Sequence, residues 1–426
     1  MGFTAGMRAT PCDYRHNVRC EPAHRLRCFP LTISAMRYTS ACQTPRAVAN
    51  GSPSREKIRP NGVEETGKAT FKSRDFDVRP LLVIWEMTQA CDLKCMHCRA
   101  SAQPHRHALE LSTAEAFNLV DQVANMRVPM FVLTGGDPLK RPDLQAIVQY
   151  ARHRSVKTSL TPSATPLLTR EAVFKLKESG LMRLALSLDG STAQLHDGFR
   201  GVPGSWKRTL DAVEWSHEAK LPVQVNTRVT LHNLHDLDNL VELLTSIKVV
   251  LWSVFFLVPI GRGQISNLLS PEEHEAVFAK LYAASKRVRF HIKTTEGQHY
   301  RRYVLQQHAQ AAQSMTAIAD LIAHAPSGVN DGKGFVFVSH TGEVYPSGFL
   351  PLSAGNILWE PLADIYRNSP LFLSLRDVSQ LKGKCGRCEF QDVCGGSRAR
   401  AFALTGDALA EEPCCSYIPV TQGDLG

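Results

Sequence analysis

Hydrophobic positions alternate regularly from residue 81 onward. Short runs of β-branched and aliphatic residues are separated by stretches in which apolar residues recur at helical spacing. Six runs predict strands, at residues 81–86, 130–134, 157–160, 183–188, 223–230 and 251–258. Strands separated by helices of crossover length are typical of a parallel sheet. Because six units are too few to close an eight-stranded barrel, we expect an open, partial (β/α)6 barrel of the α/β class.

The helical stretches carry signals of their own. Ser112 and Glu115 form a Ser-x-x-Glu capping box ahead of an apolar run, which predicts that a helix begins there. Apolar residues share one helical face at positions 206, 210 and 213, and again at 237, 240, 241 and 244. These faces are expected to pack on the sheet.

The pattern changes in the C-terminal part of the protein. Runs at 335–338 and 343–345, joined by His340-Thr341-Gly342, predict a β-hairpin, and a short helix around 362–367 precedes a cysteine-rich stretch. We therefore expect four regions. They are a disordered basic extension (1–75), the partial barrel (76–265), a helical connector (266–330) and a small α+β cysteine-rich domain (331–426).

The charge of the protein is concentrated in its N-terminal part. The net charge is +9, but residues 1–60 hold ten Lys or Arg against three Asp or Glu, so the other 366 residues carry only +2. A nucleic-acid-binding face would draw on the folded part, so no nucleic-acid partner is expected.

No run approaches the roughly 20 apolar residues needed to cross a bilayer, so no membrane partner is expected. A disordered tail, a transit segment or a true start at Met36 are the alternatives for this extension.

Twelve cysteines fall into three groups, with four in the N-terminal extension, three at 91–98 and five at 385–415. Disulfide frameworks suit short secreted proteins. Tight cysteine clusters far apart in a long sequence indicate metal sites in a reducing compartment. The spacing therefore predicts a cytoplasmic metalloprotein.

The first cluster is Cys91-x3-Cys95-x2-Cys98, directly after the first predicted strand. Thiolates on one short loop can hold a single iron–sulfur cube. Three ligands leave one iron open, whereas a structural zinc or an electron-carrying cube takes four. Zinc with His97 as the fourth ligand is the alternative, but adjacent residues such as His97 and Cys98 rarely bind the same tetrahedral ion.

This motif after the first strand of a partial barrel resembles the signature of radical S-adenosylmethionine (SAM) enzymes. The resemblance implies that the amino and carboxylate groups of SAM bind the open iron of a [4Fe–4S] cluster. The reduced cluster would then cleave SAM to a 5′-deoxyadenosyl radical that abstracts hydrogen from a substrate. It also implies an electron donor such as flavodoxin or ferredoxin. His97 stands where the family has an aromatic residue.

Further matches to the family follow later strands. A Gly-Gly-acidic-Pro turn after the second strand is where the family binds the methionyl amino group, and its glycines allow close approach of the backbone. Arg200, after Ser187-Leu-Asp-Gly, resembles an arginine that reaches SAM, although a solvated loop cation is an equal alternative. Pro162-Ser163-Ala164 replaces the usual Thr-Asn-Gly, and Asn226 is a weaker match. The implied SAM contacts are Gly135, Gly136, Asp137, Pro138, Ser159, Ser187, Arg200 and His97.

The second cluster resembles the SPASM domain that follows the barrel in many radical SAM enzymes. Full SPASM domains carry two auxiliary [4Fe–4S] clusters, but Ser347 and Arg398 stand where two ligands of the first are expected. We therefore expect one auxiliary cluster, although spacing alone also allows structural zinc. Pro413-x-Cys415-x-Tyr417 resembles the family's ending, so Cys415 is preferred over Cys414 as the distal ligand. The expected ligands are Cys385, Cys388, Cys394 and Cys415.

The resemblance leaves the substrate open. Maturases of peptides and of peptide-derived cofactors share this architecture, so hydrogen abstraction from a peptide or a small-molecule precursor is the first expectation. Segments 258–263 and 355–357 are also similar to enzymes that alter tetrapyrrole side chains in haem-type pathways. A non-catalytic iron–sulfur or zinc protein is the alternative from another class.

Overall fold

A computed structural model describes residues 75–311, 315–325 and 328–419, and nearly all of the predicted extension 1–75 lies outside these ranges. Within them, ten strands form one sheet in the order β10-β9-β8-β1-β2-β3-β4-β5-β6-β7. The strands are β1 (Leu82–Glu86), β2 (Met130–Thr134), β3 (Thr158–Leu160), β4 (Arg183–Ser187), β5 (Val223–Val229), β6 (Leu251–Phe256), β7 (His291–Thr295), β8 (Phe335–Val338), β9 (Glu343–Tyr345) and β10 (Gly355–Asn356).

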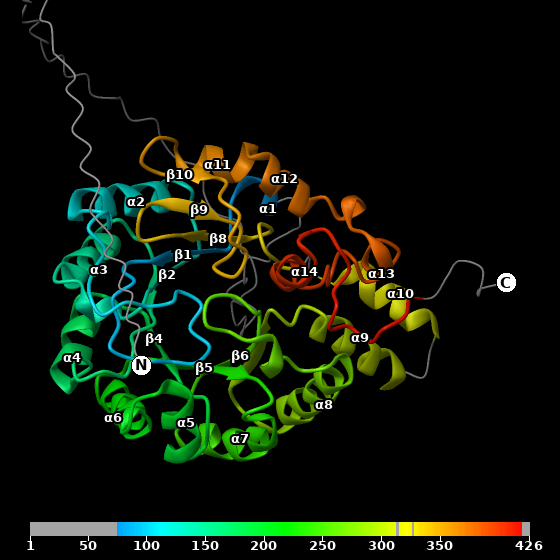
Figure 1. The fold of residues 1–426 in the computed structure, drawn as a ribbon, viewed down its shortest axis with the longest axis horizontal. Helices are drawn as coiled ribbons and strands as arrows, with labels where there is room; N and C mark the ends of the chain where they lie inside the picture. The colour runs from blue at the N-terminus through cyan, green and yellow to red at the C-terminus, as the bar shows by residue number, and fades with distance from the viewer. Residues whose placement is uncertain (1–74, 312–314, 326–327, 420–426) are drawn as a thin grey trace, which may run out of the picture. The chain divides into compact units, whose positions relative to one another are not determined.

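Strands β1 to β7 are parallel, and each pairs with the next along the sequence. The crossover helices surround the curved sheet on its outer side (Figure 1). The helices are α1 (Asp75–Val78), α2 (Thr113–Asn125), α3 (Leu144–His153), α4 (Arg170–Glu178), α5 (Ala193–Arg200), α6 (Ser205–Glu218), α7 (Leu237–Ser246), α8 (Pro271–Arg287), α9 (Tyr300–Ala311), α10 (Met315–His324), α11 (Leu362–Asn368), α12 (Pro370–Arg376), α13 (Gly383–Gly386) and α14 (Arg398–Thr405). The predicted α/β partial barrel is confirmed.

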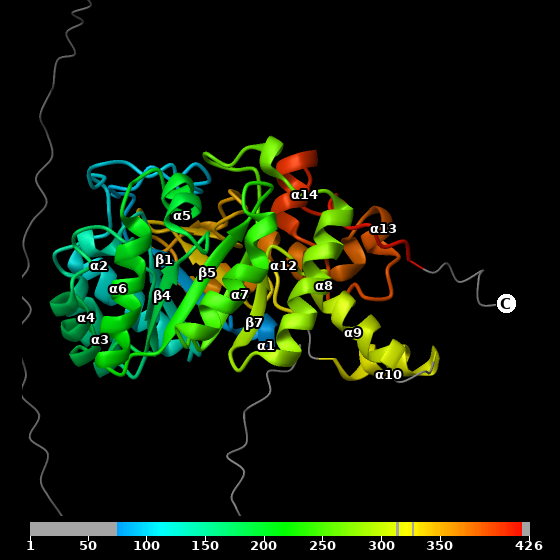
Figure 2. The same cartoon turned by 90° about the horizontal axis from the view of Figure 1, so that it is seen from below.

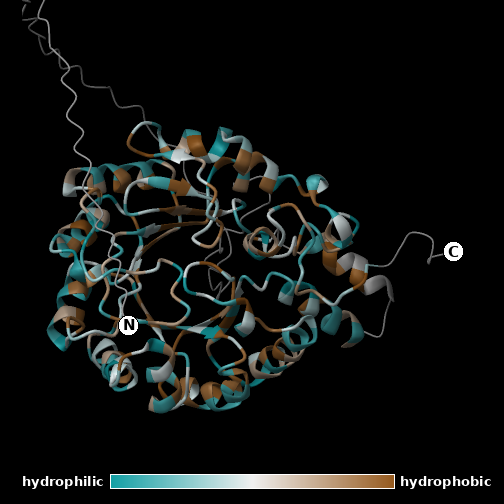
Figure 3. Ribbon diagram, viewed as in Figure 1, coloured by the Kyte–Doolittle hydropathy of each residue, from teal (hydrophilic) through white to brown (hydrophobic). Residues whose placement is uncertain are grey.

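The hydrophobic pattern explains how these helices pack. Ser112 and Glu115 form both hydrogen bonds of the capping box at the start of α2. The buried residues of α7 are the four apolar positions of its predicted face, and they join the core cluster formed by the strands. The helices are hydrophobic on one side and hydrophilic on the other (Figure 3). No helix among the described residues is long and apolar enough to span a membrane.

The sheet is larger than the sequence predicted, at both edges. Strand β7 lies in the segment predicted as a helical connector, and α8 is the crossover helix that leads to it. Its sequence, His-Ile-Lys-Thr-Thr, holds a single aliphatic residue at a half-exposed sheet edge, so hydropathy does not mark it as a strand. At the other edge β8 pairs in parallel with β1, and β9 pairs antiparallel with β8 as the predicted hairpin. The hairpin therefore extends the barrel sheet, and the predicted boundaries at 265 and 331 do not separate it from the barrel.

A buried ion pair attaches the cysteine-rich C-terminal part to the barrel. Arg400, on α14, donates from Nε to Glu412 at 2.8 Å, and neither side chain is more than 1% exposed. The same guanidinium donates to the carbonyl oxygens of Leu257, at 3.2 Å, and Glu296, at 2.8 Å, which follow β6 and β7. Figure 2 shows α14 at the same end of the sheet as α5. Although burial raises the pKa of Glu412, Arg400 holds it well below its usual range.

Replacing Arg400 with Met should destabilise the protein strongly. Glu412 would remain buried without its cation, and breaking such a pair costs about 3–5 kcal/mol in the free energy of unfolding. Anaerobic urea unfolding followed by circular dichroism measures this loss. The matched control is Lys280→Ala, which removes an exposed ion pair with Asp238 and should cost less than about 1 kcal/mol. Equal effects of the two substitutions would contradict the role given to Arg400.

Candidate functional site

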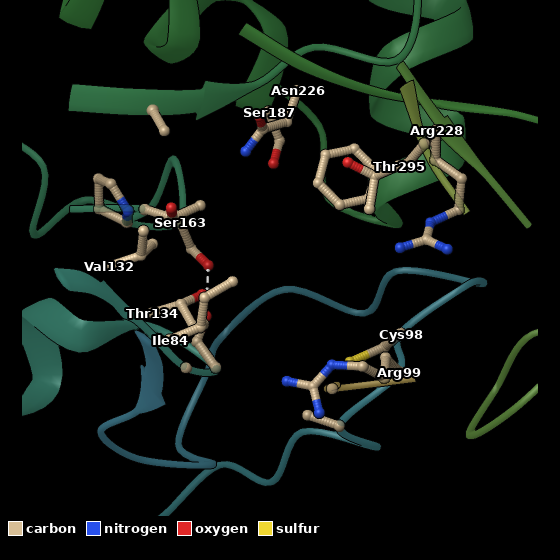
Figure 4. A pocket seen from close by; sticks show the side chains of 18 of the residues that line it. Ile84, Cys98, Arg99, Val132, Thr134, Ser163, Ser187, Asn226, Arg228 and Thr295 are labelled. Carbon is tan, nitrogen blue, oxygen red and sulfur yellow. Dashed lines mark hydrogen bonds between the residues drawn. The ribbon is translucent and has the colours of Figure 1, made fainter. Parts of the chain in front are cut away.

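A cavity of about 280 Å³ lies inside the barrel, and loops that follow the carboxyl ends of its strands form part of its wall. We call it the barrel cavity. Its walls come from strands β1 to β8, from the end of α5 and from the loops that follow β1, β2, β3, β4, β6 and β9. Figure 4 shows labelled side chains reaching into this space from several of these elements. The predicted residues that line it are Cys91, Cys95, His97, Cys98, Gly135, Gly136, Ser159, Ser187 and Arg200.

The cysteine loop after β1 is fixed at several points. The backbone N–H of Cys91 donates to Gln103 O at 2.7 Å, and that of Lys94 donates to Arg200 O at 3.1 Å. Cys91 and Cys95 are buried and Cys98 is half-buried, and all three thiols belong to one small cluster of packed side chains. The structure therefore brings the three cysteines to one wall of the barrel cavity.

The surroundings of these thiols differ. Burial raises the pKa of Cys91, and a hydrogen bond with Ser163 only partly offsets this. For Cys98 the backbone N–H of Ala102 and the guanidinium of Arg262 outweigh burial and lower the pKa, which favours the thiolate. Among the described residues, no three His, Cys, Asp or Glu side chains lie close enough to bind a single metal ion. In an iron–sulfur cube each thiolate binds a different iron, so this donor set fits such a cube.

The Gly-Gly-Asp-Pro turn is bound to the base of the cysteine loop. The N–H of Gly136 donates to Thr88 O at 2.7 Å, and the N–H of Asp137 donates to Ala90 O at 2.6 Å. A Cβ atom on Gly136 would lie 2.5 Å from Ala90 O, so only glycine allows this approach. The Asp137 carboxylate is buried and accepts a hydrogen bond from Thr165 at 2.7 Å. Asp137 and Pro138 thus lie behind the cavity wall, whereas both glycines form part of it.

Ser163 is a cavity residue that the sequence analysis did not assign. Its side chain points into the cavity (Figure 4). The hydroxyl donates to Gly136 O at 2.8 Å and lies 3.4 Å from the sulfur of Cys91. It belongs to the Pro-Ser-Ala segment that replaces the family's Thr-Asn-Gly. This departure from the family's pattern could have identified Ser163 as a cavity residue, because it places a hydroxyl in the loop after β3.

Arg200 is a largely buried, ion-paired residue at the end of α5, not a solvated loop cation. Its side chain is 12% exposed, forms an ion pair with Asp189 and lies 3.7 Å from the sulfur of Cys95. Burial lowers the pKa of Arg200, but Asp189 and Cys95 together raise it above its usual value, so the guanidinium stays charged. Its Nε has no hydrogen-bond partner among the described residues. A carboxylate of a bound ligand would fit this donor.

His97 is buried and neutral. Burial, followed by nearby Arg200 and Arg228, holds its pKa well below the usual range. Its ring lies 4.3 Å from that of Phe199, between centroids, and its Nδ1 lacks a partner in the described part of the protein. A polar atom buried in this way is normally satisfied. The unpartnered atoms of His97 and Arg200, next to three thiols, therefore fit a polar ligand such as SAM.

The barrel cavity is strongly cationic, which the sequence analysis missed. Its lining includes Asp189 as the acidic residue and six cations, which are Arg99, Arg183, Arg200, Arg228, Arg262 and Lys293. They come from β4, β5, β7, the end of α5 and two loops, so no local motif gathers them. Two sequence features could have indicated cations in the cavity. They are Arg99, which follows Cys98 directly, and the Gly-Arg-Gly sequence around Arg262.

Several of these cations lack acidic partners. The Nε atom of Arg228 and two nitrogens of Arg262 have no hydrogen-bond partner among the described residues. The guanidinium of Arg228 lies 5.2 Å from the centroid of the Phe349 ring. Burial, and then the charge of Arg183, lowers the pKa of Lys293 to about 8. The cavity can therefore bind a ligand with more than one negative group.

A second, smaller cavity lies in the C-terminal part, and we call it the cysteine cavity. Its lining includes Cys385, Cys388, Cys394 and Cys415 together with His299, Arg302, Lys384 and Glu412. Cys414 is buried but does not line this cavity, and its N–H donates to Glu412 at 3.0 Å. Burial raises the pKa of Cys388 and of Cys394 to about 12. Bound iron would stabilise these thiolates, so four converging thiols fit an iron–sulfur cube.

The two positions where SPASM ligands are absent have structural partners instead. Ser347 is buried, and its hydroxyl accepts the N–H of Phe349 at 3.2 Å. Arg398 is also buried and donates to the carbonyl oxygens of Ala408 at 3.0 Å and Ala410 at 2.6 Å. Arg398 therefore stabilises a loop next to the cysteine cavity, whereas Ser347 stabilises the loop that brings Phe349 to the barrel cavity.

Comparison with known proteins places this geometry in a family. The model of the Radical SAM superfamily matches residues 85–246. AdoMet-dependent heme synthase of Methanosarcina barkeri is 42% identical over 340 residues, which cover 80% of this chain and 97% of that protein. PqqA peptide cyclase of Rhodopseudomonas palustris is 29% identical over 352 residues, which cover 80% of this chain and 88% of that protein.

A solved structure has the same fold. Streptococcus suis SuiB bound to S-adenosylmethionine matches with a TM-score of 0.63 at 17% identity, covering 80% of this chain and 78% of that one. The superfamily model spans the end of β1, the cysteine loop and strands β2 to β5, and the M. barkeri protein is matched over nearly its whole length. The chain therefore belongs to the radical SAM superfamily.

Proposed function

We propose that this enzyme abstracts hydrogen from a side chain of a carboxylate-bearing tetrapyrrole held in the barrel cavity. As a member of its superfamily it uses a [4Fe–4S] cluster and SAM. The observation that carries the substrate proposal is the charge of the cavity, where six Lys or Arg face a single Asp. A tetrapyrrole combines a large apolar ring with several carboxylates, and the cavity offers partners for both.

The cations of the barrel cavity are held in a site where charge is costly to bury. A buried cation without a partner is costly, because it gives up its hydration without a compensating interaction. Arg228 and Arg262 keep unpartnered nitrogens, and the guanidinium of Arg228 lies beside the rings of Phe255 and Phe349. Guanidinium groups bind carboxylates with paired hydrogen bonds, and aromatic walls suit a planar ring. Several carboxylates on one ligand would therefore stabilise the cavity.

The relatives support the same substrate class. The M. barkeri heme synthase, at 42% identity, is named for a tetrapyrrole product. Segment 258–263, which resembles tetrapyrrole-modifying enzymes, packs on the cysteine loop, because the N–H of Arg262 donates to Cys98 O at 2.9 Å. We therefore prefer a tetrapyrrole over a peptide substrate, whereas the sequence alone had favoured a peptide.

The residues have separate roles in this proposal. When bound, the reduced cluster supplies the electron that splits SAM into methionine and a 5′-deoxyadenosyl radical. Arg200, fixed by Asp189, and the neutral His97 orient SAM. The remaining cations hold the tetrapyrrole so that a C–H bond in one of its substituents breaks as a new C–H bond forms on the 5′ carbon. The proposed cluster ligands are Cys91, Cys95 and Cys98 in the barrel and Cys385, Cys388, Cys394 and Cys415 in the auxiliary site.

A peptide substrate is the second candidate. The relative named PqqA peptide cyclase is 29% identical over a similar share of the sequence. An acidic peptide would also find partners among the cavity cations. Binding measurements with both ligand types separate the two candidates.

Replacing the cysteines in two sets should separate the two clusters. The reconstituted protein should hold about eight irons, as two four-iron clusters. Ala at Cys91, Cys95 and Cys98 should abolish 5′-deoxyadenosine formation and leave about four irons. Ala at Cys385, Cys388, Cys394 and Cys415 should also leave about four irons, with slow SAM cleavage retained. Zinc in the C-terminal site, or 5′-deoxyadenosine at the wild-type rate from the first variant, would refute the ligand assignment.

Removing two cavity cations should weaken tetrapyrrole binding. In the double variant Arg228→Gln and Arg262→Gln, the Kd for an iron porphyrin with four propionates should rise at least tenfold. A charged hydrogen bond contributes about 1.5–3 kcal/mol, and 1.4 kcal/mol is tenfold in affinity. Anaerobic titration of the porphyrin absorbance band measures the Kd.

Two controls accompany that titration. Lys207→Gln removes an exposed lysine on α6 and should leave the Kd unchanged. The tetramethyl ester of the porphyrin should bind weakly to the wild-type protein and to the double variant alike. Equal affinity of wild type and double variant for the free acid, or tighter binding of an acidic peptide, would contradict the tetrapyrrole proposal.

A further inference from the structure

His299 is a buried histidine that faces the proposed auxiliary cluster. It lies between β7 and α9, and its carbonyl oxygen accepts the N–H of Tyr303 at 3.1 Å in the first turn of α9. Its side chain is completely buried, yet it lines the cysteine cavity with the four cysteines. The last parallel strand of the barrel therefore leads directly to this side chain.

Both ring nitrogens of His299 lack a hydrogen-bond partner among the described residues. Two other buried histidines differ, because His196 accepts the N–H of Asp189 at 3.0 Å and His274 contacts Ser270 O at 2.8 Å. Burial holds the pKa of His299 well below its usual range, so the ring is neutral and carries one N–H. A fully buried N–H without an acceptor is destabilising. We therefore expect that a ligand in the cysteine cavity supplies a hydrogen-bond acceptor for this N–H.

The other neighbours of His299 do not supply this acceptor. On one side its ring meets Phe278 edge-on at 4.7 Å between centroids, and His274 at 5.2 Å. The carboxylate of Glu412 already accepts hydrogen bonds from Arg400 and from the backbone N–H groups of Ser397 and Cys414. These three neighbours therefore do not accept the N–H of His299, whereas the cysteine cavity lies beside its ring.

We propose that His299 donates a hydrogen bond to a sulfur atom of the auxiliary cluster and thereby raises its reduction potential. The proposal rests on the auxiliary cluster of the proposed function. The four cysteines occupy all four irons, so the histidine acts as a donor and not as a ligand. Reduction adds negative charge to the cluster, and an N–H donor stabilises that form more than the oxidised one. His299 is thus a positioning residue that adjusts the cluster electronically.

The test compares His299→Phe, which removes the N–H, with His299→Gln, which keeps an N–H donor at a similar distance from the backbone. Both are measured as full-length reconstituted protein in a redox titration followed by electron paramagnetic resonance. In the Phe variant the ratio of oxidised to reduced auxiliary cluster at a fixed potential should rise about tenfold, which is 59 mV for one electron. The Gln variant should recover much of this shift. The barrel cluster, identified because its signal changes on adding SAM, should keep its potential.

A second measurement uses the wild-type protein and does not depend on a variant that folds. With ¹⁵N-labelled histidine, the reduced auxiliary cluster should show a hyperfine coupling to one histidine nitrogen. Wild-type potential in the Phe variant, or no such coupling in the wild type, overturns the role of His299. A protein that holds only four irons, none lost on replacing Cys385, instead overturns the auxiliary cluster itself, so the two failures are distinguishable.

Discussion

Two backbone hydrogen bonds fix the position on which the rest of the site depends. They run from Gly136 to Thr88 and from Asp137 to Ala90, and they join the turn after β2 to the base of the cysteine loop after β1. Parallel strands end at the same edge of a sheet, so the loops after β1 and β2 meet there in any such barrel. The absence of a side chain on Gly136 lets the two backbones touch. Three cysteines, Ser163 and Arg200 can then surround one end of the barrel cavity.

The same edge gathers charge that the protein itself does not neutralise. Arg200 is balanced by Asp189 and Arg99 by Glu86, at 2.6 Å, but Arg228 and Arg262 keep unpartnered nitrogens. Such an arrangement costs folding stability unless a ligand completes it. In a radical enzyme this cost has a use, because a ligand held at several points cannot move away from the reacting carbon. Under the proposed function, the cavity cations would both bind the substrate and keep it beside the reacting carbon.

The cysteine-rich C-terminal part is connected to the barrel cavity through hydrogen bonds to the ends of β6 and β7. Arg400 bonds to the carbonyl oxygens that follow β6 and β7, while its partner Glu412 has its N–H 3.3 Å from the sulfur of Cys385. Thr295, at the end of β7, lines the barrel cavity, and His299, four residues later, lines the cysteine cavity. One short segment therefore connects the two proposed cluster sites.

Local patterns predicted much of the fold and of the cysteine chemistry. The capping box of α2, the buried face of α7 and the hairpin of β8 and β9 all match the structure, because each depends on residues close in sequence. Strand β7 was missed because an edge strand needs few apolar residues. The cavity cations were missed because they come from separate strands and meet only in the folded protein. His299 likewise could not be identified from the sequence, because its two unpartnered ring nitrogens are visible only in the structure.

The most direct test follows the hydrogen atom that the enzyme removes. An iron porphyrin carrying deuterium on its propionate groups is incubated anaerobically with the reconstituted protein, SAM and a reductant. Mass spectrometry of the 5′-deoxyadenosine should show that it has gained one deuterium, and its yield should depend on the porphyrin. Unlabelled 5′-deoxyadenosine, formed at the same rate with and without the porphyrin, would contradict the account.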